Sequence, residues 1–151
     1  MSSSAPSSTT GGQPASLTTV IDGRHHLVGS RCNSCGTHSF PTQAACSRCG
    51  AATADVALPA TGTVWTWTVQ RLQPKPPYRG PEPFQPFAVG YVDLGPLRVE
   101  SPLTGHSVDE WRIGETVELV VASNDEPVRS FAFAAVPPAG NGPAPQTEAA
   151  T

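Results

Sequence analysis

The sequence has few charged side chains, and lysine is almost absent. Charged residues make up 14% of its 151 positions, acids outnumber bases by 12 to 9, and Lys75 is the single lysine. Proteins that bind nucleic acid gain much of their affinity from basic side chains that displace counterions from the phosphates. Because the net charge is −3 and no basic stripe is evident, we expect no nucleic-acid partner.

Long hydrophobic runs are absent as well. No stretch approaches the ~20 apolar residues that a membrane-spanning helix needs, and the N-terminal residues lack the basic and apolar regions of a signal peptide. We therefore expect a cytoplasmic protein with no membrane partner. In a reducing compartment, paired cysteines bind metal or exchange electrons more often than they form structural disulfides.

The usual signatures of catalysis are also missing. The sequence contains no phosphate-binding loop, dinucleotide fingerprint, paired acids or Ser-His-Asp order. Four histidines are present, His25, His26, His38 and His106, and none is required as a metal ligand because four cysteines are available. We assign no catalytic residue to this chain.

The sequence does contain two Cys-x-x-Cys pairs, each followed by a glycine, with ten residues between Cys35 and Cys46. Their cysteines are Cys32, Cys35, Cys46 and Cys49. Each motif supplies two thiolates from one tight turn, and its glycine permits the backbone conformation that such a turn needs. Four thiolates complete a tetrahedral shell with no position left for water, so we predict a structural Zn²⁺ site. The alternatives are a rubredoxin-type iron site, a disulfide and a redox pair. A redox pair of the thioredoxin type lies at the start of a helix, and neither Cys-x-x-Cys pair here is expected to begin one.

Beyond Thr61, apolar and polar side chains alternate, which is typical of half-buried strands. Strands are expected at 62–71, 87–94, 97–101, 116–123 and 128–136, after a lead-in strand at 25–30. In the first of the five, alternation places Trp65, Trp67 and Val69 on one face and Val64, Thr66 and Thr68 on the other. Apart from one helical turn within 107–115, nothing has a helical period. We therefore predict an all-β protein with a five-stranded barrel of the OB-fold type, since an immunoglobulin-like sandwich needs about seven strands.

Both ends of the chain are rich in Ser, Thr, Gly, Pro and Ala and poor in large apolar residues. Such segments bury too little apolar surface to offset the entropy lost on ordering. We predict flexible tails at 1–23 and 137–151, a zinc ribbon at 24–60 and the OB-fold barrel at 61–136.

A proline-rich loop interrupts the barrel at 72–86. Its sequence, LQPKPPYRGPEPFQP, contains six prolines, which stiffen it. Loops of this length are usually functional or disordered. Arg71, Lys75 and Arg79 suit anionic phosphates, and Tyr78 offers apolar contact. The alternative is a crossover that merely covers one end of the barrel.

The order of these parts resembles a known family. Two CxxCG motifs are followed by Gly62-Thr63-Val64, the proline-rich insertion, PFAVGYVDL and IGETVEL. This order is similar to that of the acyl-CoA-associated family in which a rubredoxin-like zinc ribbon is fused to an OB-fold, and the resemblance covers about residues 24–136. Members of that family accompany thiolase-fold enzymes of the lipid-transfer-protein type, and some occur with hydratase-like acyl-CoA proteins.

The resemblance implies a non-catalytic accessory subunit of a thiolase-superfamily enzyme, either a thiolase or an aldolase. That enzyme would act on acyl-CoA, as in the degradation of steroid side chains. The implied partner is a thiolase-fold subunit in a hetero-oligomer, with Lys75, Tyr78 and Arg79 at the acyl-CoA entrance.

The chain departs from this family in two places. A Ser/Thr-rich tail and a short strand replace the usual N-terminal helix, and the segment after Asp93 is short, so substrate contacts carried there by relatives are in doubt. The alternative functions are a nucleic-acid-binding protein built from a zinc ribbon and an OB-fold, and an independent acyl-CoA carrier or enzyme.

Overall fold

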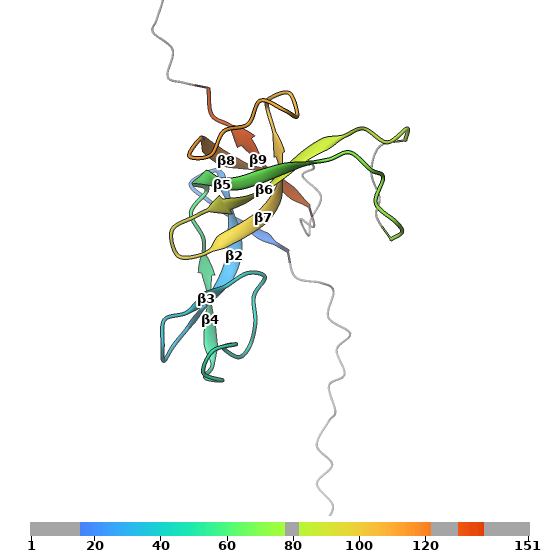
Figure 1. Ribbon diagram of the computed structural model, residues 1–151. Coiled ribbons are helices and arrows are strands. Elements are labelled where there is room, and N and C mark those ends of the chain that lie inside the picture. Colours follow the sequence, from blue (N-terminus) through green and yellow to red (C-terminus); the bar gives the residue numbers. More distant parts are fainter. Residues whose placement is uncertain (1–15, 78–81, 122–129, 138–151) are drawn as a thin grey trace, which may run out of the picture.

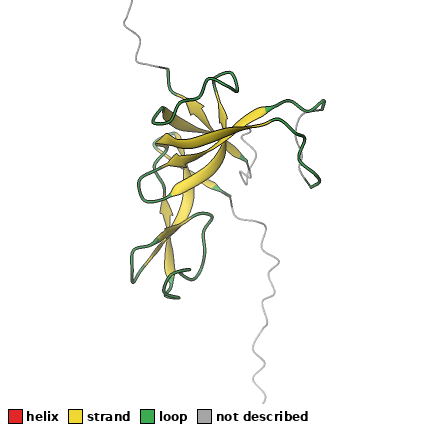
Figure 2. Ribbon diagram, viewed as in Figure 1, coloured by secondary structure: helices red, strands yellow, loops and turns green. Residues whose placement is uncertain are grey.

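The chain forms two β-sheets that follow one another in sequence. A computed structural model describes residues 16–77, 82–121 and 130–137, and every regular element in these ranges is a strand (Figures 1 and 2). The first sheet contains β1 (Thr18–Ile21), β2 (Arg24–Cys32), β3 (His38–Ser39) and β4 (Thr53–Ala57). The second contains β5 (Thr61–Gln70), β6 (Phe87–Asp93), β7 (Arg98–Thr104), β8 (Thr116–Val121) and β9 (Phe131–Ala135). The described ranges hold no helix that would cross a membrane.

The second sheet closes into a barrel with the strand order β5-β6-β7-β9-β8, and β8 pairs back with β5. Only the β7–β9 pair is parallel among the pairs described, and the other neighbours are antiparallel. This is the Greek-key order of an OB-fold. The predicted all-β fold, with a ribbon followed by a five-stranded barrel, is confirmed.

A β-bulge in β5 changes which of its side chains face the barrel interior. The register with β6 shifts between Val64 and Thr66, so Trp65 is the extra residue. Val64 is buried and Trp67 packs against the core, whereas Trp65 is 48% exposed. The prediction that Trp65 and Trp67 share one face, opposite Val64, is therefore wrong. Strict alternation holds only along an uninterrupted ladder, and one inserted residue reverses the faces beyond it.

The central strand of the first sheet is β2, which pairs with β1, β3 and β4. A two-residue turn at Asp22 and Gly23, with φ of 50° and 76°, joins β1 to β2 as in a type I′ hairpin. The prediction of a tail over 1–23 is wrong for residues 18–21. Residues 18–21 read Thr-Thr-Val-Ile, all β-branched, and the tight turn lets them pair with β2, which orders this segment.

One apolar core joins the ribbon to the barrel. Leu27 of β2 and Leu58, which follows β4, are fully buried in the same cluster as Phe133 of β9. The Leu58 N–H donates to the Leu27 carbonyl at 2.8 Å, and the His26 side chain donates to the Leu58 carbonyl at 2.9 Å. The barrel members of the cluster are Val64, Ala88, Val92, Leu94, Val99, Leu103, Trp111, Val117 and Phe133. The ribbon is therefore seated on the barrel through shared side chains.

The segment predicted to hold a helical turn, 107–115, forms two turns and no helix. The Glu110 N–H donates to the Ser107 carbonyl at 3.0 Å, which closes the first turn. Farther along, Gly114 N donates to the Val64 carbonyl at 2.7 Å, and Val64 N donates to the Glu115 carbonyl at 2.9 Å. Backbone groups that a helix would use internally are thus engaged by β5, and the helix prediction is wrong.

Candidate metal centre

Two tight turns of the same geometry carry the four cysteines. Gly36 N donates to the Cys32 carbonyl at 3.2 Å, and Gly50 N donates to the Cys46 carbonyl at 2.9 Å. Both glycines have positive φ, 71° and 75°, a conformation that L-residues with a side chain rarely adopt. The glycine that follows each motif therefore closes the turn that aims its two thiols to the same side.

The four sulfur atoms come together at the tip of the ribbon. All lie within 4.8 Å of one another. The closest pairs are Cys32–Cys49 at 3.5 Å, Cys35–Cys49 at 3.5 Å and Cys35–Cys46 at 3.7 Å. A tetrahedral zinc ion with Zn–S bonds of about 2.3 Å holds its sulfurs about 3.8 Å apart. The cluster therefore fits one zinc ion, and it is the only group of metal-ligating side chains found among the described residues.

Backbone N–H groups point at the two buried sulfurs. Ser34 N and Cys35 N each lie 3.4 Å from Cys32 Sγ, and Arg48 N lies 3.4 Å from Cys46 Sγ. The Cys35 and Ser34 amides favour the thiolate of Cys32 and lower its pKa. The first turn thus favours Cys32 in the charged form that binds metal.

The pKa values of the two exposed thiols, Cys35 and Cys49, are shifted in opposite directions. The Thr37 hydroxyl, 3.2 Å from Cys35 Sγ, and the Thr37 amide lower the pKa of Cys35 to about 6. The Ala51 amide favours a Cys49 thiolate, but the sulfurs of Cys32 and Cys35 outweigh it and raise the pKa of Cys49 to about 11. Four thiolates this close repel one another, so a divalent cation is what allows all four to ionise together.

Close packing at the base of the ribbon fixes the second cysteine motif relative to the first. The buried Ser30 Oγ lies 2.8 Å from Ser39 Oγ and accepts a hydrogen bond from Gln43 N at 3.1 Å. A Cβ added at Gly29 would lie only 2.6 Å from the Ser39 carbonyl oxygen. The absence of a side chain at Gly29 therefore lets β3, and the chain leading to Cys46, lie directly against β2.

The residues of and beside the proline-rich loop that were predicted to contact phosphates or a partner differ in what the structure shows of them. Arg71 forms an ion pair with Asp109, so its charge is already partnered. Lys75 is exposed on the loop. Tyr78 and Arg79 lie outside the described residues. The set of Lys75, Tyr78 and Arg79 stays a prediction.

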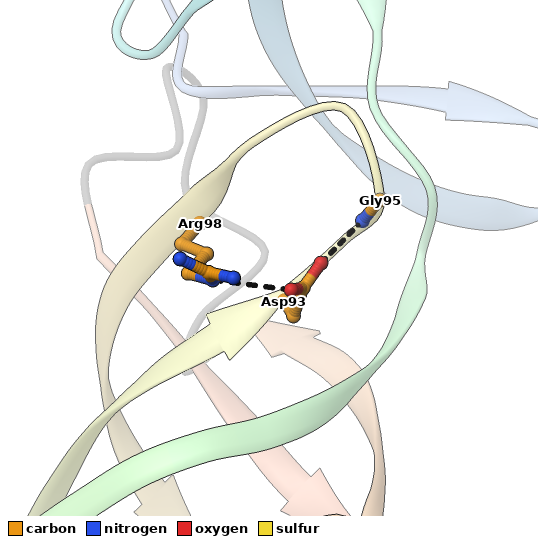
Figure 3. Close-up of polar contacts among 3 residues, drawn as sticks. All are labelled: Asp93, Gly95 and Arg98. Atoms are coloured by element: carbon orange, nitrogen blue, oxygen red, sulfur yellow. Dashed lines mark hydrogen bonds and ion pairs between the residues drawn. The ribbon is translucent and has the colours of Figure 1, made fainter.

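Sequence reasoning missed a cluster on the outer face of the barrel, where Asp93 ends β6 and Arg98 begins β7. One Asp93 carboxylate oxygen accepts a hydrogen bond from Gly95 N at 2.8 Å, and the other lies 3.1 Å from Arg98 Nε (Figure 3). The Gly95 amide, followed by the Arg98 guanidinium, lowers the pKa of Asp93. Arg98 also covers the ring of Trp65, 4.2 Å from its centroid. The sequence signals only the Gly95-Pro96 turn, because pairing of distant strands brings the other residues together.

A four-cysteine ribbon seated on a five-stranded OB-fold barrel defines the class of the protein as a zinc ribbon fused to an OB-fold. The family model of the ChsH2 rubredoxin-like zinc ribbon domain matches residues 22–54, and that of the ChsH2 C-terminal OB-fold domain matches residues 55–122. The two matches are consecutive and in the same order as the two sheets. Together the two models match residues 22–122, so the chain is similar to ChsH2-type proteins along both of its sheets.

Two individual proteins are similar to the chain. A DUF35 domain-containing scaffold protein of Methanocaldococcus jannaschii is 29% identical over 103 residues, which cover 66% of this chain and 70% of that protein. A chain of the solved Ltp2-ChsH2(DUF35) aldolase superposes with a TM-score of 0.58 and 28% identity, covering 73% of this chain and 84% of that one. The assignment of zinc has two independent supports, the match to the zinc ribbon model and the positions of the four sulfur atoms.

Proposed function

We propose that the protein is a non-catalytic accessory subunit of a thiolase-superfamily enzyme that acts on acyl-CoA, and that its zinc ion is structural. The observation that carries this proposal is the likeness to a chain of the Ltp2-ChsH2(DUF35) aldolase, which extends over 84% of that chain. The similar DUF35 scaffold protein supports an assembly role. Of the two reaction types, the solved relative favours an aldolase. Steroid side chains or related acyl groups are the substrates that we propose for it.

Zinc suits a structural role in this chain. The cysteines supply all four ligands of a tetrahedral ion, so the ion has no vacant position at which to bind a substrate. A bound zinc ion crosslinks the two cysteine turns, and the hydrogen bond between Ser30 and Ser39 holds β3, which lies between these turns in sequence, against β2. The reacting groups of the enzyme are therefore assigned to the partner subunit.

Co-expression tests the assembly. The chain is produced together with a thiolase-fold protein of the same organism, and the purified material is analysed by size-exclusion chromatography with light scattering. We expect one complex whose mass includes both subunits, stable at micromolar concentration. Separate elution of the two proteins under those conditions contradicts the proposal.

For the proline-rich loop we propose a position at the acyl-CoA entrance of the partner, with Lys75 and Arg79 near phosphates and Tyr78 beside them. The loop joins the ends of β5 and β6, which project from the barrel (Figure 1). Lys75 is exposed there, in a chain of net negative charge that otherwise offers a polyanion little attraction.

Replacing Lys75 and Arg79 together by Ala is expected to raise the acyl-CoA KM of the assembled enzyme about ten-fold, which corresponds to ~1.4 kcal/mol. Turnover number and complex formation stay nearly unchanged, because contacts of this kind lie at the rim. The matched control is Arg24→Ala, which removes an exposed arginine from the ribbon. An unchanged KM returns the loop to a covering role, and loss of assembly without a change in KM makes it a protein contact alone.

A further inference from the structure

The outer face of β5, β6 and β7 carries a cluster of aromatic and charged side chains that the barrel itself does not cover. The β-bulge turns Trp65 outward, and Tyr91 on the neighbouring strand is also exposed, by 42%. Tyr91 lies opposite Glu100 in the β6–β7 ladder, and Asp93 lies opposite Arg98, so the two pairs share this face. The cluster of Trp65, Tyr91, Asp93, Arg98 and Glu100 is called the aromatic surface below.

Contacts within the aromatic surface hold its side chains in place. The rings of Trp65 and Tyr91 meet edge to face with centroids 6.3 Å apart, and the Arg98 guanidinium lies 4.2 Å from the Trp65 ring centroid. Asp93 in turn fixes Arg98, as Figure 3 shows. The Tyr91 hydroxyl donates to the Glu100 carboxylate, and this hydrogen bond raises the pKa of Tyr91. Exposed side chains that are already ordered lose little entropy when they bind a partner.

The surface combines the chemistry of a protein-binding hot spot with an adjacent hollow. Trp, Tyr and Arg are the residues most enriched at hot spots. Beside Tyr91 lies a cavity of about 230 Å³, lined by Thr66, Thr68, Val89 and Glu100 among others. An apolar side chain of a partner fits such a hollow, with the aromatic rings at its border.

The aromatic surface also continues toward the proline-rich loop. Phe87, Val89 and Tyr91 alternate along β6 and therefore share one face. Phe87 packs edge to face against Phe84 of the loop, with ring centroids 6.3 Å apart. A partner that contacts the loop is thus in position to contact the aromatic surface as well.

The charges on the surface select the kind of partner. Arg98 is paired with Asp93, and Glu100 leaves one further negative charge, so the surface offers no free cation to a phosphate backbone. Single-stranded nucleic acid needs both stacking rings and unpaired basic groups. A protein surface with an apolar centre and a basic side chain opposite Glu100 complements both the rings and the charge.

From these observations we infer that the aromatic surface docks the thiolase-fold partner subunit, through an apolar patch of that subunit that carries an Arg or Lys opposite Glu100. This inference rests on the proposed accessory function and deepens it, because it assigns the partner to one face of the barrel. Trp65 and Tyr91 are the anchors, and Glu100 sets the orientation.

The test measures, by isothermal titration calorimetry, the affinity of the purified chain for the thiolase-fold protein that co-expression identifies as its partner. Trp65→Ala and Tyr91→Ala are each expected to raise Kd at least ten-fold, since truncated hot-spot residues have effects of this size. Tyr91→Phe keeps the ring and is expected to retain most of the affinity. Glu100→Gln is expected to raise Kd a few-fold and to flatten its dependence on salt. Circular dichroism and zinc content establish that each variant is folded.

The matched control is Val20→Ala, which truncates a side chain that is 55% exposed on β1, in the other sheet. Its Kd is expected to stay within about two-fold of the wild-type value. If Trp65→Ala and Tyr91→Ala bind as tightly as the wild type, the docking inference is wrong while the accessory function stands. If the wild type itself does not bind, the accessory function and the inference fail together.

Two further outcomes assign the surface to a different occupant. Self-association of the wild type that both substitutions abolish, measured by light scattering, means that a second copy of this chain covers the surface. Micromolar binding of a fluorescent single-stranded oligonucleotide that Trp65→Ala abolishes means that the surface binds nucleic acid. Either result overturns the inference.

Discussion

The ribbon and the barrel are stabilised by different means. In the ribbon, four cysteine sulfurs occupy the tip, and its large buried apolar side chains, Leu27 and Leu58, lie where it meets the barrel. In the barrel, a cluster that includes Val64, Val92 and Phe133 fills the interior of a closed sheet. A small sheet with so few apolar contacts depends on a metal ion for its stability, whereas a closed barrel does not. The two parts are therefore expected to fail under different treatments.

Loss of one zinc ligand is expected to have the largest effect. Structural zinc contributes ~10–16 kcal/mol in small zinc-binding peptides. Cys35→Ser, at an exposed position, is expected to lower the zinc-to-protein ratio from near one to near zero. Hydrogen exchange then becomes fast in β2 and β4 and stays slow in β6 and β7.

The matched control is Ser34→Ala, which leaves the backbone amide that faces Cys32 Sγ in place and is expected to retain the metal. Elemental analysis and hydrogen-exchange mass spectrometry give the two readings. A Cys35→Ser variant that keeps one zinc ion and a protected ribbon would contradict the assignment, and so would a wild type that carries iron.

Truncation in the barrel core is expected to have the second largest effect and to spare the metal. Phe133 has no exposed surface, and a Phe→Ala change in a core costs about 3–5 kcal/mol. The free energy of unfolding of Phe133→Ala, from urea denaturation, is expected to fall by that amount. Below the melting temperature the zinc-to-protein ratio stays near one. If the free energy of unfolding falls by less than about 1 kcal/mol, or if the folded variant releases zinc, the ribbon and the barrel are not stabilised separately.

The smallest expected effect belongs to the β6–β7 turn and depends on pH. Because the Gly95 amide and Arg98 lower the pKa of Asp93 in the folded state, the ionised carboxylate stabilises the fold at pH values above its unfolded pKa. This contribution is lost as the pH falls through the lower, folded pKa. Asp93→Asn is therefore expected to melt slightly below the wild type at pH 7 and at the same temperature near pH 2. A difference that does not shrink on acidification shows that Asp93 acts by packing and not by charge.

The features that could be read from the sequence are those that local spacing determines. The cysteine turns need only residues close in sequence, so Cys32, Cys35, Cys46 and Cys49 were correctly expected to lie together. The five barrel strands follow from alternation within each segment. The sequence Asn124-Asp125-Glu126-Pro127 predicts a turn between the last two strands, and these residues lie outside the described ranges.

The features that could not be read depend on partners distant in sequence. The bulge at Trp65 arises from the register with β6, which no pattern within β5 specifies. The short strand β1 is different, because its partner β2 is adjacent in sequence. The β-branched run Thr18–Ile21 followed by Asp22-Gly23 is a local hairpin signal, which the prediction of a tail overlooked. Tyr91 and Arg98 join Trp65 only after three strands assemble, so the aromatic surface has no signature in any single segment.

Turnover of an acyl-CoA substrate by the thiolase-fold protein, measured with and without this chain, is the most direct test of the accessory role. The expected result is rapid turnover by the complex and little or none by either subunit alone, with no activity in this chain by itself. Addition of the wild-type chain restores turnover, and addition of the zinc-free Cys35→Ser chain does not. Full activity of the partner without this chain, or turnover by this chain alone, contradicts the accessory role.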